Sequence, residues 1–299
     1  AHIHSDNEED TSNEKPLTWG TLFRVRQTYV FIIGKLLTDP IWWFFLFWLP
    51  SYFSTSFSLD LKKPGWPLVI IYMATSIGSI GGGYLSSYFI QKGWPVYKAR
   101  KTAMFIFALC VLPIMSAKYA TNMWVAVALI SLAAAAHQAW SANIFTVASD
   151  MFPKKAISSV VGIGGMAGGI GGVLITKVGG YIFDTYANKG ISESFAKFNE
   201  LGNSAFVSQI TSLDLASKYG DKVNLNIMAL NKLPVEVAER LKAIDLNLFN
   251  QLLEIQKPLV QSNMTVAYTI MFAFCAVAYL IAWSVMKLLV PKYKKITDL

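Results

Sequence analysis

The chain has 299 residues, of which 54% are hydrophobic and only 15% are charged, and its formal net charge is +8. Its mean hydropathy of +0.42 lies outside the range of ordinary soluble domains, so the composition excludes that class. Cys110 and Cys275 stand within long apolar stretches, and neither a disulfide framework nor a metal site is expected from them.

Apolar runs recur along the chain. A helix needs roughly 20 apolar residues to cross a bilayer, and the runs that reach this length fall at about 36–56, 67–90, 102–121, 123–147, 158–183 and 264–288. Because hydrocarbon offers no partner to a free N–H or C=O group, these runs must be helical. The sequence therefore predicts an all-α polytopic membrane protein with six transmembrane helices.

Basic residues flank the predicted spans mainly on one side. That side carries Lys15, Arg24, Arg26, Lys35, Lys92, Lys98, Arg100, Lys101, Lys154, Lys155, Lys287, Lys292, Lys294 and Lys295. The two short connections on the other side carry Lys62, Lys63 and Lys118. Lys and Arg concentrate in cytoplasmic connections, so both termini are expected in the cytoplasm. Anionic lipid explains the net charge, and no nucleic-acid partner is expected.

The connection between the fifth and sixth spans, about 185–263, is much longer than the others. Long segments cross the membrane largely regardless of their charge, so this one is predicted to be an extracytoplasmic insert. Pro234 opens an expected helix whose apolar residues recur at helical spacing: Val237, Leu241, Ile244, Leu248, Leu252 and Ile255. The insert could cap the outer side of the bundle, dock on a partner or pack upon itself, and self-packing is favoured.

The second and fifth spans are dense in small residues four positions apart. These are Ala74, Gly78 and Gly82 in the second span, and Gly164, Gly168 and Gly172 with Gly165 and Gly169 in the fifth. Small residues let helix backbones approach closely in a membrane. The pattern fits a static helix pair or a surface on which helices slide and pivot. Glycines on several faces of one helix favour motion.

The middle of the fourth span holds a group of polar side chains in an otherwise apolar helix: His137, Gln138, Trp140, Ser141 and Asn143. Polar groups in a membrane are expensive unless they face protein or water, so the group predicts a solute-binding cavity. His137 could carry a proton or remain neutral and bonded to a neighbouring helix. Hydrogen bonding to a polar solute is favoured over acid–base chemistry.

The first span is filled with aromatic residues, in the run "LTDPIWWFFLFWLPSYF". Trp and Tyr offer an apolar face and one donor, which suits contact with a sugar-like solute; the alternative is an aromatic belt at the membrane interface. Trp43, Trp48 and Tyr52 are the candidate contacts. Asp39, which precedes Pro40, is expected to start the helix near its cytoplasmic end.

Motifs of enzymes are missing from the sequence. It contains no nucleophile elbow, no phosphate-binding Gly-Lys-Ser/Thr, no HExxH and no paired carboxylates inside the spans. The glycine run 162–172 has no strand before it and no acidic ribose partner after it, so it fails as a dinucleotide site. We therefore expect neither an enzyme nor a bound cofactor or metal.

Three stretches carry a resemblance to a known family: "KLLTDPIWWFFLFWLPSYF", "GGGYLSSYFIQKGWPVYKARK" and "HQAWSANIFTVASDMFPKKAISSVVGIGGMAGGIGG". The chain resembles the carboxy-terminal half of hexuronate transporters, which belong to the anion:cation symporter family of the major facilitator superfamily. The resemblance covers residues 17–184 and 264–295. The cytoplasmic motif of that family is matched by Gly82, Gly83, Lys98, Arg100 and Lys101, whereas Ser86 and Ser87 stand where an Asp is common.

The resemblance implies a division of the chain. Residues 1–34 would be a cytoplasmic linker, 35–184 the first five transmembrane helices of this half (family helices 7–11), 185–263 the insert, and 264–299 the last helix with a cytoplasmic tail. An amino-terminal six-helix half would be missing. The start at Ala1 rather than Met also indicates a fragment or a processed product.

The resemblance further implies a function. The function implied would be proton-coupled uptake of a sugar-acid anion, such as glucuronate or galacturonate, by alternating access in the bacterial inner membrane. The acids that carry the proton would lie in the other half, because no acid or Arg of this chain is expected well inside a span. The alternatives are transport of an aldonate, aldarate or other organic anion, and a six-helix membrane anchor whose outer domain binds a partner.

Overall fold

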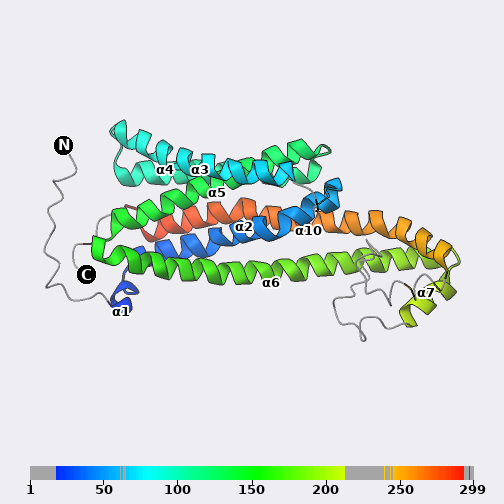
Figure 1. Cartoon of the computed structure of the whole chain (residues 1–299). Helices are drawn as coiled ribbons and strands as arrows, with labels where there is room; N and C mark the ends of the chain where they lie inside the picture. The colour runs from blue at the N-terminus through cyan, green and yellow to red at the C-terminus, as the bar shows by residue number, and fades with distance from the viewer. Residues whose placement is uncertain are drawn as a thin grey trace.

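The computed structural model describes residues 18–60, 62, 65–212, 239, 243, 245–292 and 296. Its elements are all helical: α1 (Trp19–Leu22), α2 (Arg26–Phe57), α3 (Trp66–Gln91), α4 (Val96–Val111), the 3₁₀ helix η2 (Leu112–Tyr119), α5 (Met123–Met151), α6 (Lys154–Glu200), α7 (Ser204–Ser212) and α10 (Leu246–Leu289). Within these described ranges, six segments are long and apolar enough to cross a membrane, with α4 and η2 together forming the third. The spans run side by side along one axis (Figure 1). The prediction of an all-α polytopic membrane protein is confirmed.

Several spans are longer than the apolar runs suggested. Helix α2 begins at Arg26 and not near residue 36, so part of the expected linker 1–34 belongs to the first span. Helix α6 continues through the expected boundary at 184/185 to Glu200, and α10 begins at Leu246, well before 264. Helix ends outside the hydrocarbon can be polar, because water satisfies their side chains, and hydropathy therefore does not mark them.

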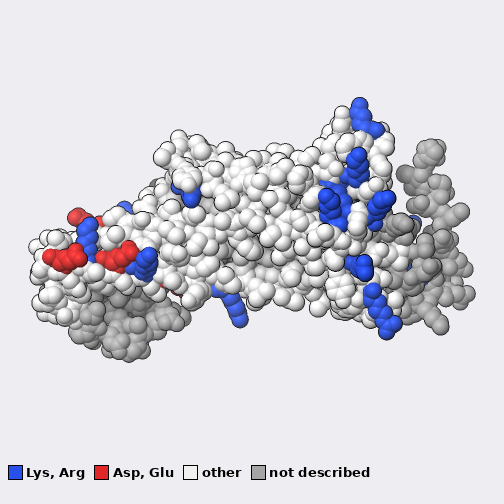
Figure 2. All heavy atoms as spheres, turned by 180° about the vertical axis from the view of Figure 1, so that it is seen from behind, with Lys and Arg blue, Asp and Glu red and all other residues white. Residues whose placement is uncertain are grey.

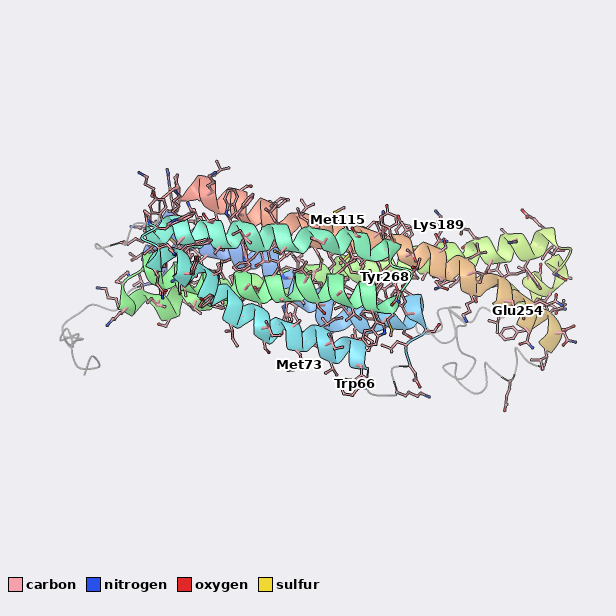
Figure 3. All side chains as sticks on the ribbon, turned by 90° about the horizontal axis from the view of Figure 1, so that it is seen from above. Trp66, Met73, Met115, Lys189, Glu254 and Tyr268 are labelled. Carbon is pink, nitrogen blue, oxygen red and sulfur yellow. The ribbon has the colours of Figure 1, made fainter. Side chains whose placement is uncertain are left out.

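Helix α6 and helix α10 project beyond the other spans as an antiparallel pair (Figure 1). A Cβ at Gly190 would lie 2.7 Å from the Cα atom of Val260, so the two backbones nearly touch there. In the same region, Asn263 Nδ2 donates to Glu193 Oε2 at 2.7 Å. Most of the described part of the expected insert therefore belongs to helices that continue two spans, while α7 is a separate short helix. Glu254 lies on the projecting part of α10 (Figure 3).

The proposed insert helix falls mostly outside the described residues. Of its apolar positions, Pro234, Val237, Leu241 and Ile244 are not described, whereas Leu248, Leu252 and Ile255 belong to α10. The side chain of Asp245 caps that helix by accepting from the N–H groups of Asn247 and Leu248. Asp245 is thus the N-cap that marks the start of α10, and the sequence analysis did not identify it.

Helix α3 packs on α5 through glycine. A Cβ at Gly82 would lie 2.5 Å from the Cα atom of Ala139, and a Cβ at Gly78 would collide with the backbone of Ala135. The opposite side of α3 is open: its apolar window is 17% buried, against 50% for α2 and for α5. Met73 is 63% exposed and, with Trp66, lies on this outer side (Figure 3). Only one face of α3 is thus used by this bundle.

Charge is distributed unevenly along the molecule. Lys and Arg gather at the end where α3 passes into α4 and α5 into α6, whereas the tip of the projecting pair carries Asp and Glu together with Lys (Figure 2). We call the first of these the basic end. The connections 92–95 and 152–153 share this side of the molecule with the end of α10.

The glycine contacts of α3 lead to a first prediction. Gly82→Ala should lower the free energy of unfolding by about 1–3 kcal/mol, because its methyl group must push α3 away from Ala139. Gly81→Ala should raise stability by up to about 1 kcal/mol, since nothing lies near that position and Ala favours a helix. Denaturant unfolding of the 299-residue chain in detergent measures both. Equal shifts would show that the close α3–α5 contact is absent.

Candidate functional site inside the spans

A lysine and an aspartate of α2 form an ion pair inside the bundle. Lys35 Nζ lies 2.8 Å from Asp39 Oδ2, one helical turn away, and their side chains are 8% and 21% exposed. Lys35 also lies over the ring of Phe145 in α5, with Nζ 4.6 Å from the ring centroid. Helix α6 leaves room for the pair, because a Cβ at Gly168 would collide with the carboxylate of Asp39. A glycine at 168 is therefore needed for this packing.

The ion pair lies deep in the membrane-spanning region. Gly168, which contacts Asp39, is about 21 Å along α6 from Lys154, because a helix rises 1.5 Å per residue. His137 of α5 is also about 21 Å from the basic end, where α5 finishes at Met151. Hydrocarbon is about 30 Å thick. Ionisable groups at such depth are expensive, which makes this pair a candidate functional site.

A second polar pair adjoins the first from α5 and α10. His137 Nδ1 lies 2.5 Å from the hydroxyl oxygen of Tyr279, and the imidazole stacks on Trp42 with centroids 5.5 Å apart. Both polar side chains are buried. Trp42 lies on α2 three residues after Asp39, so the imidazole of His137 packs on the helix that carries the ion pair. We call Lys35, Asp39, Trp42, His137 and Tyr279 the central polar cluster.

The prediction that Asp39 starts a helix near the membrane edge is wrong, because α2 begins 13 residues earlier, at Arg26. The prediction that no acid lies well inside a span is also wrong, because Asp39 does. Lys35 was expected in a cytoplasmic connection but belongs to the same buried pair. The Asp-Pro pair is compatible with the helix interior here. Pro40 cannot donate to the Leu36 carbonyl, and α6 approaches that carbonyl at Gly171, where a Cβ would lie 2.6 Å from the oxygen.

The three aromatic candidates of α2 are placed differently. Trp43 is 38% exposed and stacks on Phe47, while Trp48 is half-buried and stacks on Phe183 of α6. Tyr52 is buried, and its hydroxyl donates to the carbonyl of Ala117 at 3.1 Å. Of the three, Trp43 has the largest surface accessible to a solute.

The polar candidates of α5 also divide. Gln138 is half-buried, whereas Trp140 is fully buried with its ring edge against Tyr279. Asn143 Nδ2 donates to the carbonyls of Gly82 and Ala139, at 2.8 and 2.9 Å, and so ties α5 to α3. Asn143 Oδ1 and Trp140 Nε1 are buried and have no hydrogen-bond partner among the described residues.

The glycines of α3 and α6 serve two faces. Gly78, Gly82, Gly164, Gly168 and Gly172 meet neighbouring helices, whereas nothing lies near Gly81, Gly83, Gly162, Gly165 or Gly169. We call the exposed sides of α3 and α6 that carry the second group the open face. Phe145 of α5 is also exposed, at 40%. The glycines could be recognised in the sequence, but the sequence could not distinguish those that contact a neighbouring helix from those with no neighbour.

The cytoplasmic motif forms a network at the basic end. Arg100 Nε lies 3.1 Å from Asp150 Oδ2 of α5, and Arg100 Nη1 donates to Ser86 Oγ of α3 at 2.6 Å. The serine that departs from the family pattern therefore still binds the arginine, and α5 supplies the carboxylate. Among the described residues, no group of three or more His, Cys, Asp and Glu could hold a metal ion.

Comparisons with known proteins point to membrane transport. The family model described as Major Facilitator Superfamily matches residues 3–176. The hexuronate transporter of Escherichia coli (strain K12) is 26% identical over 196 residues, which are 65% of this chain and 45% of that protein. The D-galactonate transporter of Escherichia coli O6:H1 is 26% identical over 175 residues, 58% of this chain and 40% of that protein.

A human transporter is also similar to this chain. The voltage-gated purine nucleotide uniporter of Homo sapiens is 27% identical over 221 residues, 70% of this chain and 48% of that protein. The chain spans less than half the length of each of these three relatives.

The buried ion pair gives a second prediction. Removing one partner leaves a charge without compensation, so Lys35→Met and Asp39→Leu should each lower the free energy of unfolding by about 3–5 kcal/mol. The double variant should lose much less than the sum. Lys189 and Glu193 are the matched control, because they have the same spacing but are 60% and 42% exposed. The coupling energy between the two control residues should be less than about 1 kcal/mol, and the cycle cancels the loss of the hydrogen bond that Glu193 also accepts from Asn263.

Denaturant unfolding in detergent micelles, analysed as a double-mutant cycle, measures both pairs. Additive effects at Lys35 and Asp39 would mean that the two charges do not stabilise each other in the folded protein.

Proposed function

Because the chain belongs to the Major Facilitator Superfamily, whose members are transporters and not enzymes, we propose that it forms one half of a secondary transporter for sugar acids. Relatives named for hexuronate and D-galactonate support this class of cargo. The basic end would be cytoplasmic in an inner membrane of bacterial type. A second six-helix half would complete the transporter.

The observation that carries this proposal is the charged pair at half depth. A membrane anchor has no need of Lys35 and Asp39 inside its spans, because burying them costs free energy that apolar residues would not. A transporter of organic anions needs a cation at that depth. Lys35 supplies it in this half, and Asp39 holds that cation when no cargo is bound.

The open face of α3 and α6 supports a second half. Its large apolar residues are mostly exposed, among them Ile77 at 72%, Ile80 at 76% and Ile170 at 58%. Glycines at 81, 165 and 169 have nothing near them, so another helix can approach closely there. We propose that the partner half packs on this face and pivots on it, with the cargo held between the halves beside Gln138 and Trp43.

The ion pair suggests how a proton would be coupled to uptake. Protonation of Asp39 removes its negative charge and releases Lys35, which then pairs with the carboxylate of the cargo. Loss of the proton restores the Lys35–Asp39 pair and expels the cargo. Each state keeps the buried site near electrical neutrality, which is what the low dielectric of the membrane favours.

The cargo proposal gives a third prediction. Proteoliposomes that contain the full-length protein, with both halves, should accumulate glucuronate or galacturonate when the outside is made acidic. Uptake should fall sharply when the proton gradient is collapsed. The preference for cargo is ranked by how strongly an excess of galactonate, glucarate or a purine nucleotide inhibits this uptake. Uptake driven only by membrane potential, or blocked only by the nucleotide, would contradict a proton-coupled sugar-acid transporter.

The coupling proposal gives a fourth prediction. Asp39→Asn mimics the protonated carboxyl, so it should still exchange labelled for unlabelled sugar acid across the membrane but should lose at least about tenfold in gradient-driven accumulation. Lys35→Gln should lose both activities. Asp184→Asn on α6 is the control, because Asp184 is exposed, and it should keep both activities.

Exchange and accumulation are measured on the same vesicles, so a folding defect, which lowers both, is separated from loss of coupling. Accumulation by Asp39→Asn at the wild-type level would place the coupling acid in the other half.

A further inference from the structure

A hollow at the basic end lies between α4 and α10. Its volume is about 730 Å³, and no described residue that lines it is acidic. The polar groups on its wall are three lysines and three hydroxyls, from Tyr97, Lys98, Lys101, Thr102, Ser284 and Lys287. Cations and hydroxyl donors of this kind suit the oxygen atoms of a phosphate group. The hollow lies outside the central polar cluster, and the proposed transport does not use it.

Contacts between the two helices fix the inner wall. Trp283 Nε1 donates to the carbonyl of Lys101 at 2.9 Å, and its ring lies 4.6 Å from that of Phe105. Lys101 Nζ donates to the carbonyls of Val290 and Pro291, both at 2.6 Å. Lys101 therefore offsets the negative end of α10 beside the hollow. These bonds fix the position of Lys101 and Trp283 in the wall of the hollow.

Two other lysines stand at the rim and are exposed. Lys287 Nζ lies 4.8 Å from the ring centroid of Trp283, and Lys98 Nζ lies 4.8 Å from that of Trp94. Their stems rest on aromatic rings while their charges stay accessible, as is common where a helix leaves the hydrocarbon. One comes from each helix, so an anion placed between α4 and α10 can meet both.

Above the hollow, the same sides of the two helices are apolar and exposed. Ile281 and Val277 precede Ser284 at helical spacing on α10 and are 49% and 44% exposed. Leu109 follows Phe105 one turn along α4 and is 42% exposed. A charged rim that leads into an apolar strip inside a membrane matches a molecule with an anionic head and hydrocarbon chains.

We propose that this hollow binds the headgroup phosphate of an anionic glycerophospholipid. Lys98 and Lys287 hold the phosphate at the rim, the hydroxyl groups of Thr102 and Ser284 donate to its oxygens, and the acyl chains lie along Leu109, Val277 and Ile281. Basic pockets between transmembrane helices are known to bind anionic headgroups. The proposal depends neither on the cargo nor on proton coupling. A free phosphate ion shares the headgroup chemistry but would make no use of the apolar strip.

Native mass spectrometry of the 299-residue chain in a neutral detergent tests the site, with phosphatidylglycerol and phosphatidylcholine as the probes. We expect retained phosphatidylglycerol with at least about tenfold preference over phosphatidylcholine. The double variant K98Q/K287Q should weaken phosphatidylglycerol binding by roughly tenfold or more, because each lysine near an anionic headgroup contributes substantially. Ser284→Trp, which fills the hollow and changes no charge, should weaken it as well.

The control is K92Q/K292Q, which removes two exposed lysines at the same end but outside the lining of the hollow. It should bind phosphatidylglycerol as the wild type does. Equal loss in this control would show general attraction of lipid to the basic end and overturn the proposal. Displacement of the lipid by excess inorganic phosphate would overturn it in favour of a soluble anion, and equal retention of both lipids would overturn it as well.

Discussion

The bundle depends on close contact between helix backbones at small residues. Lipid chains are as apolar as leucine, so no hydrophobic force pulls membrane helices together, and packing must supply the attraction. Gly82 lets α3 reach the backbone of α5, and Gly168 and Gly171 let α6 reach α2. The second of these contacts also encloses the Lys35–Asp39 pair. The glycines of α6 therefore both hold α6 against α2 and make room for the charged pair at half depth.

Much of the fold could be predicted from sequence because lipid permits few structures. The six apolar runs had to be helices, and the basic residues indicated which ends of these helices lie on the same side of the membrane. The lengths could not be predicted in the same way: α6 and α10 leave the hydrocarbon as polar helices, which hydropathy does not recognise. At Asp39 a local rule failed, because an Asp-Pro pair that commonly starts a helix here lies in the middle of α2, where Lys35 and α6 accommodate it.

The candidate site could be predicted only in part. The polar residues of α5 drew attention because polar groups in an apolar helix are unusual, and His137 does belong to the central polar cluster. Its partner Tyr279 lies on a helix far away in the sequence, so no local pattern could join them. Lys35 and Asp39 had the i,i+4 spacing of a helical ion pair, and the misplaced start of α2 hid that signal. Asn143, by contrast, is occupied largely by a bond to the α3 backbone.

The continuity of α6 has a mechanical consequence. From Gly168, beside Asp39, the helix runs about 48 Å to Glu200 but only about 21 Å back to Lys154. Any tilt of this rod about the ion pair moves its distal tip more than twice as far as its near end. Helix α10 is clamped against the rod at Gly190 and Val260, so both would swing as one arm. A change in protonation deep in the lipid would thereby be amplified into a displacement in the aqueous space beyond it.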